Sequence, residues 1–239
     1  MNSSEEFCRE NLYPFQDGIL SIVKGLNTPF YLTGGTALSR HYFKHRFSDD
    51  LDLFVNNDNS YGRYVESIFQ ELEKQQQPCN FLIDYQSLRR SASYTRLLLL
   101  KRSEGMETQL RIELVNDIAA HYGDFEHDEN LGRIDSWRNI LSNKLSAVFR
   151  YEAKDFADIW MISKRKNFSW VEIVKEAKTK EAGVDPIALY EILKSFPRDV
   201  ISTIKWNITI NEDDFLKDLS SIAEDIFKGR INSLCTGKA

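Results

Sequence analysis

The residues best suited to chemistry lie between positions 34 and 52, where a pair of glycines precedes a pair of aspartates. Gly34 and Gly35 allow a sharp turn, and their bare backbone allows close approach by a ligand. Asp50 and Asp52 are separated by one residue, so in a strand both carboxylates point to the same face. Mg²⁺ is commonly held by one or two carboxylates together with substrate phosphates. The pattern therefore predicts an anion-binding turn beside a metal-binding pair of carboxylates.

Three local elements position these residues. The apolar run from Phe30 to Leu32 favours a strand, and Thr36 is a suitable N-cap for a helix over residues 37–43. The free amides and positive dipole of such a helix would face an anion bound over the glycines. A strand from about Asp50 would bury the alternate residues Leu51, Leu53 and Val55. Taken singly, the glycines also suit an ordinary tight turn, and the aspartates a solvated strand face.

A known family has a similar motif. Gly34-Gly35-Thr36, thirteen intervening residues and then Asp50-Leu51-Asp52 resembles the signature of the polymerase-beta-like nucleotidyltransferase superfamily. The longer match, Gly34 to Leu38 followed by His45-Arg46-Phe47-Ser48-Asp49-Asp50-Leu51-Asp52-Leu53-Phe54, is similar to its AbiEii branch. Members of that branch are nucleotidyltransferase toxins of bacterial abortive-infection and toxin–antitoxin systems. The resemblance implies nucleotide binding by Gly34, Gly35 and Thr36, with Arg46 and Ser48 as further candidates. By its position just before the aspartate strand, His45 could contact phosphate or be polar surface.

Composition is that of an ordinary globular protein. The chain has 239 residues, 42% hydrophobic and 28% charged, and a net charge of −5, enough for one large or two small domains. The negative net charge argues against a protein that binds nucleic acid over most of its surface, although it does not exclude a local basic groove. The cysteines are odd in number and lack the spacing of metal ligands, which predicts a reducing compartment such as the cytoplasm. We find no signal-peptide pattern and no run of ~20 apolar residues, so we expect no membrane span.

A third carboxylate is predicted on a later strand. An N-terminal helix is expected over residues 4–26, broken or kinked at Pro14, and a further helix over 61–76. Strands are expected at 80–85, 92–101 and 108–115, the last two joined by a turn at 103–105. Alternation along the third strand exposes Glu113. By resemblance it would complete a metal-binding triad with Asp50 and Asp52. The alternatives are a solvated Glu on an edge strand, or Asp117 in that role.

Basic residues concentrate around the same strands. Such residues usually keep an exposed sheet face soluble. Together they could also bind phosphates of a nucleotide or RNA, with Tyr85 and Tyr94 available for stacking. The set comprises Arg89, Arg90, Arg96, Lys101, Arg102 and Arg111.

The chain after Ser136 reads as helical. Apolar stripes predict helices over residues 137–150, 154–163, 168–180, 186–194 and 212–227. Asn143 to Ala147 with Arg150, and then Lys154 to Ile159, resemble downstream AbiEii motifs. The resemblance implies that Lys144 reaches nucleotide phosphates and Asp155 supports the site, with Asp158 and Arg150 as helpers. Without it, these residues would be solvated helix charges.

These observations predict an α/β (α+β) fold: a polymerase-beta-like nucleotidyltransferase core with a mixed twisted sheet over residues 1–130, and a helical region over 131–239 that closes the cleft. The expected activity moves an NMP from an NTP to an acceptor with Mg²⁺ or Mn²⁺. By resemblance, the acceptor is the tRNA 3′ end and the partner a cognate antitoxin. Transfer to a protein hydroxyl, a phosphotransferase, and a non-catalytic nucleotide-binding module remain alternatives.

Overall fold

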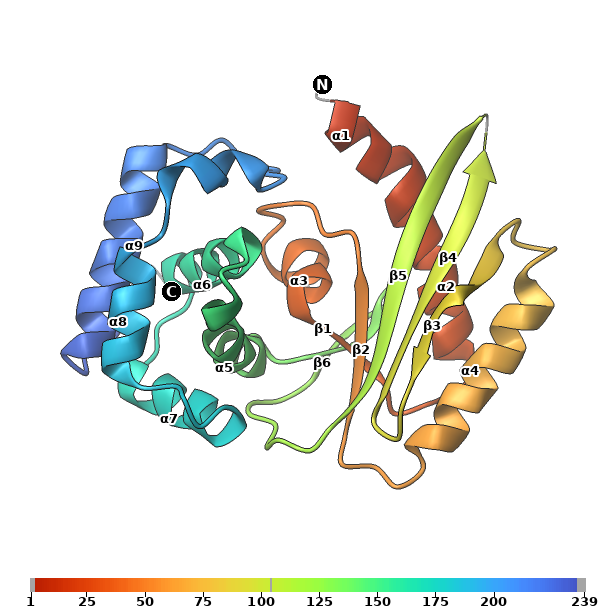
Figure 1. Ribbon diagram of the computed structural model, residues 1–239, viewed down its shortest axis with the longest axis horizontal. Coiled ribbons are helices and arrows are strands. Elements are labelled where there is room, and N and C mark those ends of the chain that lie inside the picture. The colour runs from red at the N-terminus through yellow and green to blue at the C-terminus, as the bar shows by residue number, and fades with distance from the viewer. Residues whose placement is uncertain (1–2, 104, 236–239) are drawn as a thin grey trace. The chain divides into compact units, whose positions relative to one another are not determined.

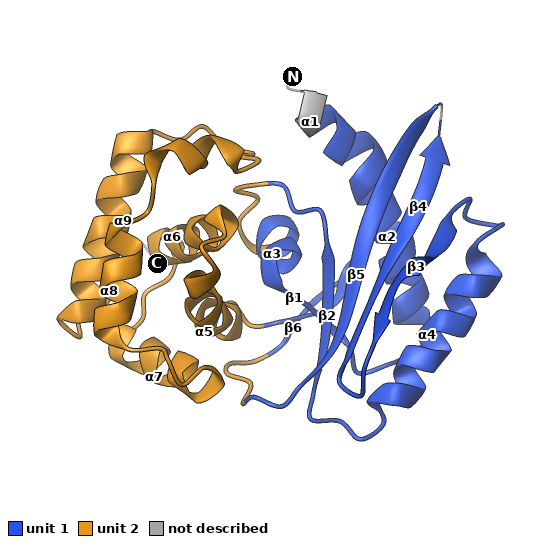
Figure 2. Ribbon diagram, viewed as in Figure 1, with its two compact units in different colours: residues 1–41, 47–119, 125–135 blue, residues 42–46, 120–124, 136–239 orange. Residues whose placement is uncertain are grey.

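The computed structural model describes residues 3–103 and 105–235, so Glu104, within the predicted turn at 103–105, lies outside the described residues. The chain forms two compact units (Figure 2). Unit 1 comprises residues 1–41, 47–119 and 125–135, and unit 2 comprises residues 42–46, 120–124 and 136–239. The predicted functional division at residue 130 stays a prediction.

Unit 1 is built on a mixed sheet (Figure 1). Within the described residues the sheet has seven strands in the order β3-β4-β5-β2-β1-β7-β6. Pairing is parallel between β2 and β5 and between β1 and β7, and antiparallel elsewhere. The strands are β1 (Tyr31–Thr33), β2 (Leu51–Asn56), β3 (Leu82–Arg90), β4 (Tyr94–Ser103), β5 (Met106–Asp117), β6 (Glu126–Asp128) and β7 (Gly132–Ile134).

Alternation gives the sheet a buried face and a polar face. Leu51, Leu53 and Val55 are at most 2% exposed, as the alternating pattern predicts. Helices α2 (Tyr13–Gly25) and α4 (Tyr61–Gln75) bury their apolar stripes, and the Tyr61 hydroxyl donates to the Leu114 carbonyl at 2.8 Å. The expected mixed sheet flanked by helices is confirmed.

The N-terminal helix differs from expectation in its geometry. It runs through α1 (Ser3–Phe7) and a π-helical segment η1 (Cys8–Leu12) into α2. Pro14 sits in the first turn of α2, where its missing N–H costs little. The Tyr13 amide donates to the Cys8 carbonyl five residues back, so the helix adapts before the proline instead of ending there.

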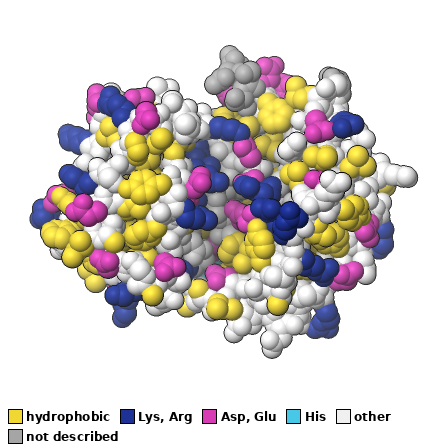
Figure 3. Space-filling model, in the orientation of Figure 1, with side chains coloured by type: hydrophobic (Ala, Val, Ile, Leu, Met, Phe, Trp, Pro, Cys, Tyr) yellow, Lys and Arg dark blue, Asp and Glu magenta, His cyan; other side chains and the backbone are white. Residues whose placement is uncertain are grey.

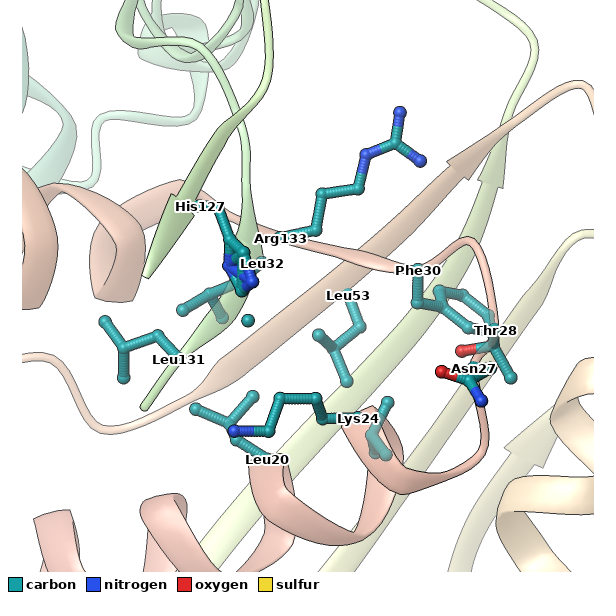
Figure 4. Close-up of a pocket in the computed structure, with 12 residues that line it drawn as sticks. Leu20, Lys24, Asn27, Thr28, Phe30, Leu32, Leu53, His127, Leu131 and Arg133 are labelled. Atoms are coloured by element: carbon teal, nitrogen blue, oxygen red, sulfur yellow. The ribbon is translucent and has the colours of Figure 1, made fainter. Parts of the chain in front are cut away.

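A pocket of about 350 Å³ lies on the buried side of unit 1 (Figure 4). Leu32 and Leu53 line it, and they alternate with residues of the polar face, so the pocket opens away from the aspartates. Lys24 contributes to its wall while donating to the Glu129 carbonyl at 2.7 Å. Arg133 stacks its guanidinium on Phe125 at 3.7 Å.

Unit 2 is helical, as predicted. Ser136 caps α5 by accepting from the Arg138 amide at 3.2 Å, and Asp185 caps α8 by accepting from the amides of Ile187 and Ala188. Trp170 and Phe215 are fully buried. Its elements are α5 (Trp137–Ala147), η3 (Val148–Arg150), α6 (Ala153–Arg165), α7 (Trp170–Lys180), α8 (Pro186–Lys194), η4 (Arg198–Thr203) and α9 (Glu212–Phe227).

Throughout residues 3–103 and 105–235, every helix is too short or too polar to cross a bilayer.

Candidate active site

Three acidic side chains share the polar face of the sheet in unit 1. Asp52 on β2 stands opposite Glu113 on β5 in the parallel ladder, so the two point to the same side. Asp50 immediately precedes β2 and, because it lies two residues before Asp52, it points to the same side of the sheet. All three are partly exposed. Because β5 lies between β4 and β2, Glu113 is on an interior strand, and the edge-strand interpretation of this residue is wrong.

Gly34 brings the chain directly against Asp52. It adopts a φ of +66°, and a Cβ at this position would lie 2.5 Å from Asp52 Oδ2. A residue with a side chain would therefore be strained and would also displace the carboxylate. The short helix α3 (Gly34–Thr36) starts here and continues into a π-helical segment, η2 (Ala37–Tyr42). The glycine turn and the aspartate strand are thus packed in contact.

Thr36 has a different local role from the one predicted. It lies inside the helix, and Thr33 occupies the N-cap position without a side-chain cap. The fully buried Thr36 hydroxyl instead donates to the Asp50 carbonyl and lies 2.9 Å from Ser48 Oγ. Gln16 donates to the Ser48 carbonyl at 3.1 Å. Thr36 and Ser48 therefore anchor the segment that carries Asp50.

Arg111 contacts two of these carboxylates. It lies two residues before Glu113 on β5 and points to the same face. Its Nη2 donates to Asp50 Oδ2, and its Nε lies 3.9 Å from Glu113 Oε1. Hydrogen bonding to Asp50, opposed by burial, raises the pKa of Arg111 above its ordinary value. Sequence reasoning counted Arg111 only among the basic residues, although its spacing from Glu113 already placed the two together.

A row of polar side chains crosses the sheet through these residues. Neighbouring strands pair Thr33 with Asp52, Asp52 with Glu113, Glu113 with Arg96, and Arg96 with Arg89. The row therefore runs from acidic on β2 and β5 to basic on β4 and β3. Figure 3 shows Lys and Arg side chains, with Asp and Glu among them, gathered over the strands of unit 1.

Tyr94 stands beside the acidic part of this row. Burial, reinforced by the Glu113 carboxylate, raises the pKa of Tyr94, because the negative phenolate would be disfavoured there. Tyr94 is consequently a neutral hydroxyl at physiological pH.

The donor set of the polar face suits a hard cation. Its members are carboxylate oxygens, which Mg²⁺ and Mn²⁺ prefer. Within the described parts of the chain, no three His, Cys, Asp or Glu side chains converge on a single metal position. The contact between Asp50 and Arg111 directs that carboxylate toward the guanidinium. Two carboxylates completed by substrate phosphates remain a fitting arrangement for Mg²⁺.

A second charged cluster lies inside unit 2. Asp158 is fully buried and accepts from Arg46 Nε and Nη2, both at 2.7 Å, and lies 2.9 Å from His45 Nε2. Lys144 Nζ lies 2.6 Å from Asp155 Oδ1 and 2.7 Å from Asp158 Oδ2. The side chain of Lys144 is 10% exposed. We define these five residues as the Asp158 cluster.

Burial and charge act against each other in the Asp158 cluster. Burial alone would raise the pKa of Asp158, but Arg46 and Lys144 hold it well below its ordinary value. Burial would lower the pKa of Lys144, but Asp158 and Asp155 raise it. Burial lowers the pKa of His45 despite its hydrogen bond to Asp158. The lysine and the aspartate are therefore charged at neutral pH, and the imidazole is neutral.

The predicted site residues are thus divided between the two units. Asp50, Asp52 and Glu113 lie together in unit 1, with the nucleotide-binding candidates Gly34, Gly35, Thr36 and Ser48 also in that unit. Lys144, Asp155 and Arg46 lie in unit 2, and the exposed Arg150 is 3.5 Å from Asp155 Oδ2. Phosphate binding by Lys144, Arg46 and His45 stays a prediction, and sequence reasoning missed the pairing of Asp158 with Arg46.

Carboxylates that can hold Mg²⁺ beside a bare glycine turn suit the transfer of nucleotidyl or phosphoryl groups. The chain belongs to the AbiEii family: the family model described as nucleotidyl transferase AbiEii toxin of type IV toxin–antitoxin systems matches residues 19–225. This confirms the family resemblance of the Gly-Gly-Thr and Asp-Leu-Asp motifs.

Similar proteins occur in Aquifex aeolicus and Helicobacter pylori. An uncharacterized Aquifex aeolicus (strain VF5) protein, aq_aa25, is 29% identical over 163 residues, covering 67% of this chain and 70% of that protein. The crystal structure of JHP933 from Helicobacter pylori has a TM-score of 0.62 at 19% identity, covering 92% of this chain and 93% of that one. A second H. pylori structure has a TM-score of 0.60 at 22% identity, covering 92% and 96%. These structural likenesses concern the fold.

Proposed function

We propose that the protein transfers an NMP from an NTP to the 3′ end of tRNA, in a reaction that requires Mg²⁺ or Mn²⁺. The observation that carries the proposal is the contact of Gly34 with Asp52, which places a bare turn beside carboxylates on one face of the sheet. Membership of a nucleotidyl transferase toxin family supports the reaction class.

The residues of unit 1 have distinct roles in this proposal. Gly34 and Gly35 approach the triphosphate with backbone alone. Two of the carboxylates of Asp50, Asp52 and Glu113, completed by substrate phosphates, would hold the metal ion, which when bound would neutralise charge on those phosphates. The acceptor hydroxyl forms a bond to the α-phosphorus, the bond to pyrophosphate breaks, and a carboxylate of the same face accepts the hydroxyl proton.

The charge of the polar face favours an RNA acceptor. Arg96 and Arg89 extend the row on the side away from β2, where they can contact phosphates of a polyanion. Arg89 Nη1 donates to the carbonyls of Gln86 and Leu88, which holds its side chain close to β3. A cognate antitoxin is proposed as the protein partner on the basis of family membership.

The test is incubation with total tRNA, Mg²⁺ or Mn²⁺, and each α-labelled NTP in turn. We expect label in tRNA, its loss in the Asp50→Ala/Asp52→Ala variant, and its loss when periodate has first destroyed the 3′-terminal diol. A matched control is Glu66→Gln, which removes an exposed carboxylate paired with Arg90. Label in a protein band would move the acceptor to a polypeptide. Full activity in the double aspartate variant would refute the site.

A further inference from the structure

Arg111 contacts two of the three acidic side chains of the polar face, Asp50 and Glu113. Its guanidinium donates to Asp50 Oδ2 and approaches Glu113 Oε1 to 3.9 Å. Both residues belong to the set that would hold the metal, and all three lie in unit 1. A divalent ion and this guanidinium therefore compete for the same oxygens, because a carboxylate oxygen directed at Arg111 is not directed at the ion.

We define the side chains of Asp50, Asp52 and Glu113 as the acidic face. We propose that Arg111 is an exchangeable counter-ion of this face: its guanidinium contacts Asp50 until metal binds, and then contacts the phosphates of the nucleotide instead. The inference rests on the proposed function. It assigns Arg111 two successive contacts, one that opposes metal binding and one that favours binding of the triphosphate.

The exposure of the pair makes such an exchange feasible. The side chain of Arg111 is 42% exposed and that of Asp50 is 21% exposed. Pairs at this level of exposure are worth little, because water and salt compete with them. Arginine also presents several donors in a planar fork that matches phosphate oxygens. Breaking the contact with Asp50 therefore costs little, and a phosphate offers a strong replacement.

The first half of the test measures metal binding without nucleotide. Mn²⁺ affinity is determined by electron paramagnetic resonance for the wild type, Arg111→Ala, Arg111→Gln and the control Arg63→Ala. Arg63 is an exposed arginine of α4 whose guanidinium donates to Ser60 Oγ. We expect both Arg111 variants to bind Mn²⁺ about 2- to 5-fold tighter, the range of an exposed ion pair, and Arg63→Ala to match the wild type.

The second half measures the phosphate contact with inorganic triphosphate in the presence of Mg²⁺. We expect both Arg111 variants to bind triphosphate about 5- to 10-fold more weakly, because they lose charge-assisted hydrogen bonds. In the transfer assay the same loss appears as a raised KM for NTP. Circular dichroism before each titration confirms that the variants are folded.

The outcomes separate the inference from the function on which it rests. Mn²⁺ binding that is unchanged or weaker in both Arg111 variants would overturn the counter-ion role. Unchanged triphosphate affinity would overturn the transfer to phosphate. If Asp50→Ala/Asp52→Ala bound Mn²⁺ as tightly as the wild type, the metal assignment of the proposed function would itself fail, and the inference with it.

Discussion

Replacing Asp158 by Asn removes one negative charge from the centre of the Asp158 cluster without changing the size of the side chain. In the wild type, Arg46 and Lys144 are balanced by Asp158 and Asp155, while burial keeps His45 neutral by lowering its pKa. In the variant, Arg46 and Lys144 lose the negative charge that both of them contact. The interior of unit 2 then carries one more net positive charge than in the wild type.

The magnitude follows from burial. Asp158 is 0% exposed, and the side chains of Arg46 and Lys144 are 4% and 10% exposed. Removing one partner of a buried ion pair costs about 3–5 kcal/mol, since the remaining charge stays desolvated. We therefore expect Asp158→Asn to lower the free energy of unfolding of unit 2 by about 3–5 kcal/mol, and the melting temperature by roughly 10 °C.

The assay is urea denaturation followed by tryptophan fluorescence at pH 7. All four tryptophans of the sequence lie in unit 2, so the signal reports that unit. The matched control is Glu66→Gln, which breaks an ion pair whose partners are 45% and 52% exposed. It should cost less than about 1 kcal/mol.

Equal stability losses in Asp158→Asn and Glu66→Gln would refute the reasoning. So would a loss below about 1 kcal/mol in Asp158→Asn with an unchanged m value, because the cluster would then contribute no more than a surface pair. A reduced m value would instead indicate that unit 2 unfolds through an intermediate, and hydrogen exchange would then have to supply the free energy.

Three further substitutions test separate features. Gly34→Ala should lower kcat/KM for NMP transfer about 100-fold, because the added Cβ would collide with Asp52 and displace its carboxylate. Gly62→Ala is the control: a Cβ there has open space, so kcat/KM should be unchanged. His45→Gln should flatten the pH dependence of stability in urea titrations at pH 5 to 8. Because burial lowers the pKa of His45, the unfolded chain binds the proton first, so wild-type stability falls as pH drops below about 6.5. Ser136→Ala should cost about 1 kcal/mol in thermal unfolding by uncapping α5.

Local pattern predicted most of the acidic face. Period-two alternation placed Leu51, Leu53 and Val55 inside, and strict alternation along β5 placed Glu113 on the opposite face. These predictions succeed because the direction of a side chain in a strand depends only on its immediate neighbours. Helices α8 and α9 were predicted with their observed bounds, since their caps are also local.

Other features depended on distant parts of the chain. Strands β6 and β7 have three residues each, too few for periodicity to show, and β7 is recruited by pairing with β1. Strand β3 extends to Arg90, past the predicted end at residue 85, through an irregular register between Asp84 and Arg89. Arg46 and Asp158 are 112 residues apart, and nothing in either segment alone indicates their contact.

The chain uses the same pair of residue types in two opposite ways. An arginine meets an aspartate in both units, but the Arg46–Asp158 pair is almost fully buried, whereas the Arg111–Asp50 pair is 42% and 21% exposed. As water is excluded from an ion pair, the Coulomb attraction between its two charges strengthens and dissolved ions compete less for either partner. The buried pair is therefore a fixed part of the fold, while the exposed pair can open for a metal ion or a phosphate. Raising the salt concentration should loosen the second pair and leave the first intact, which makes ionic strength a direct way to separate structure from function in this protein.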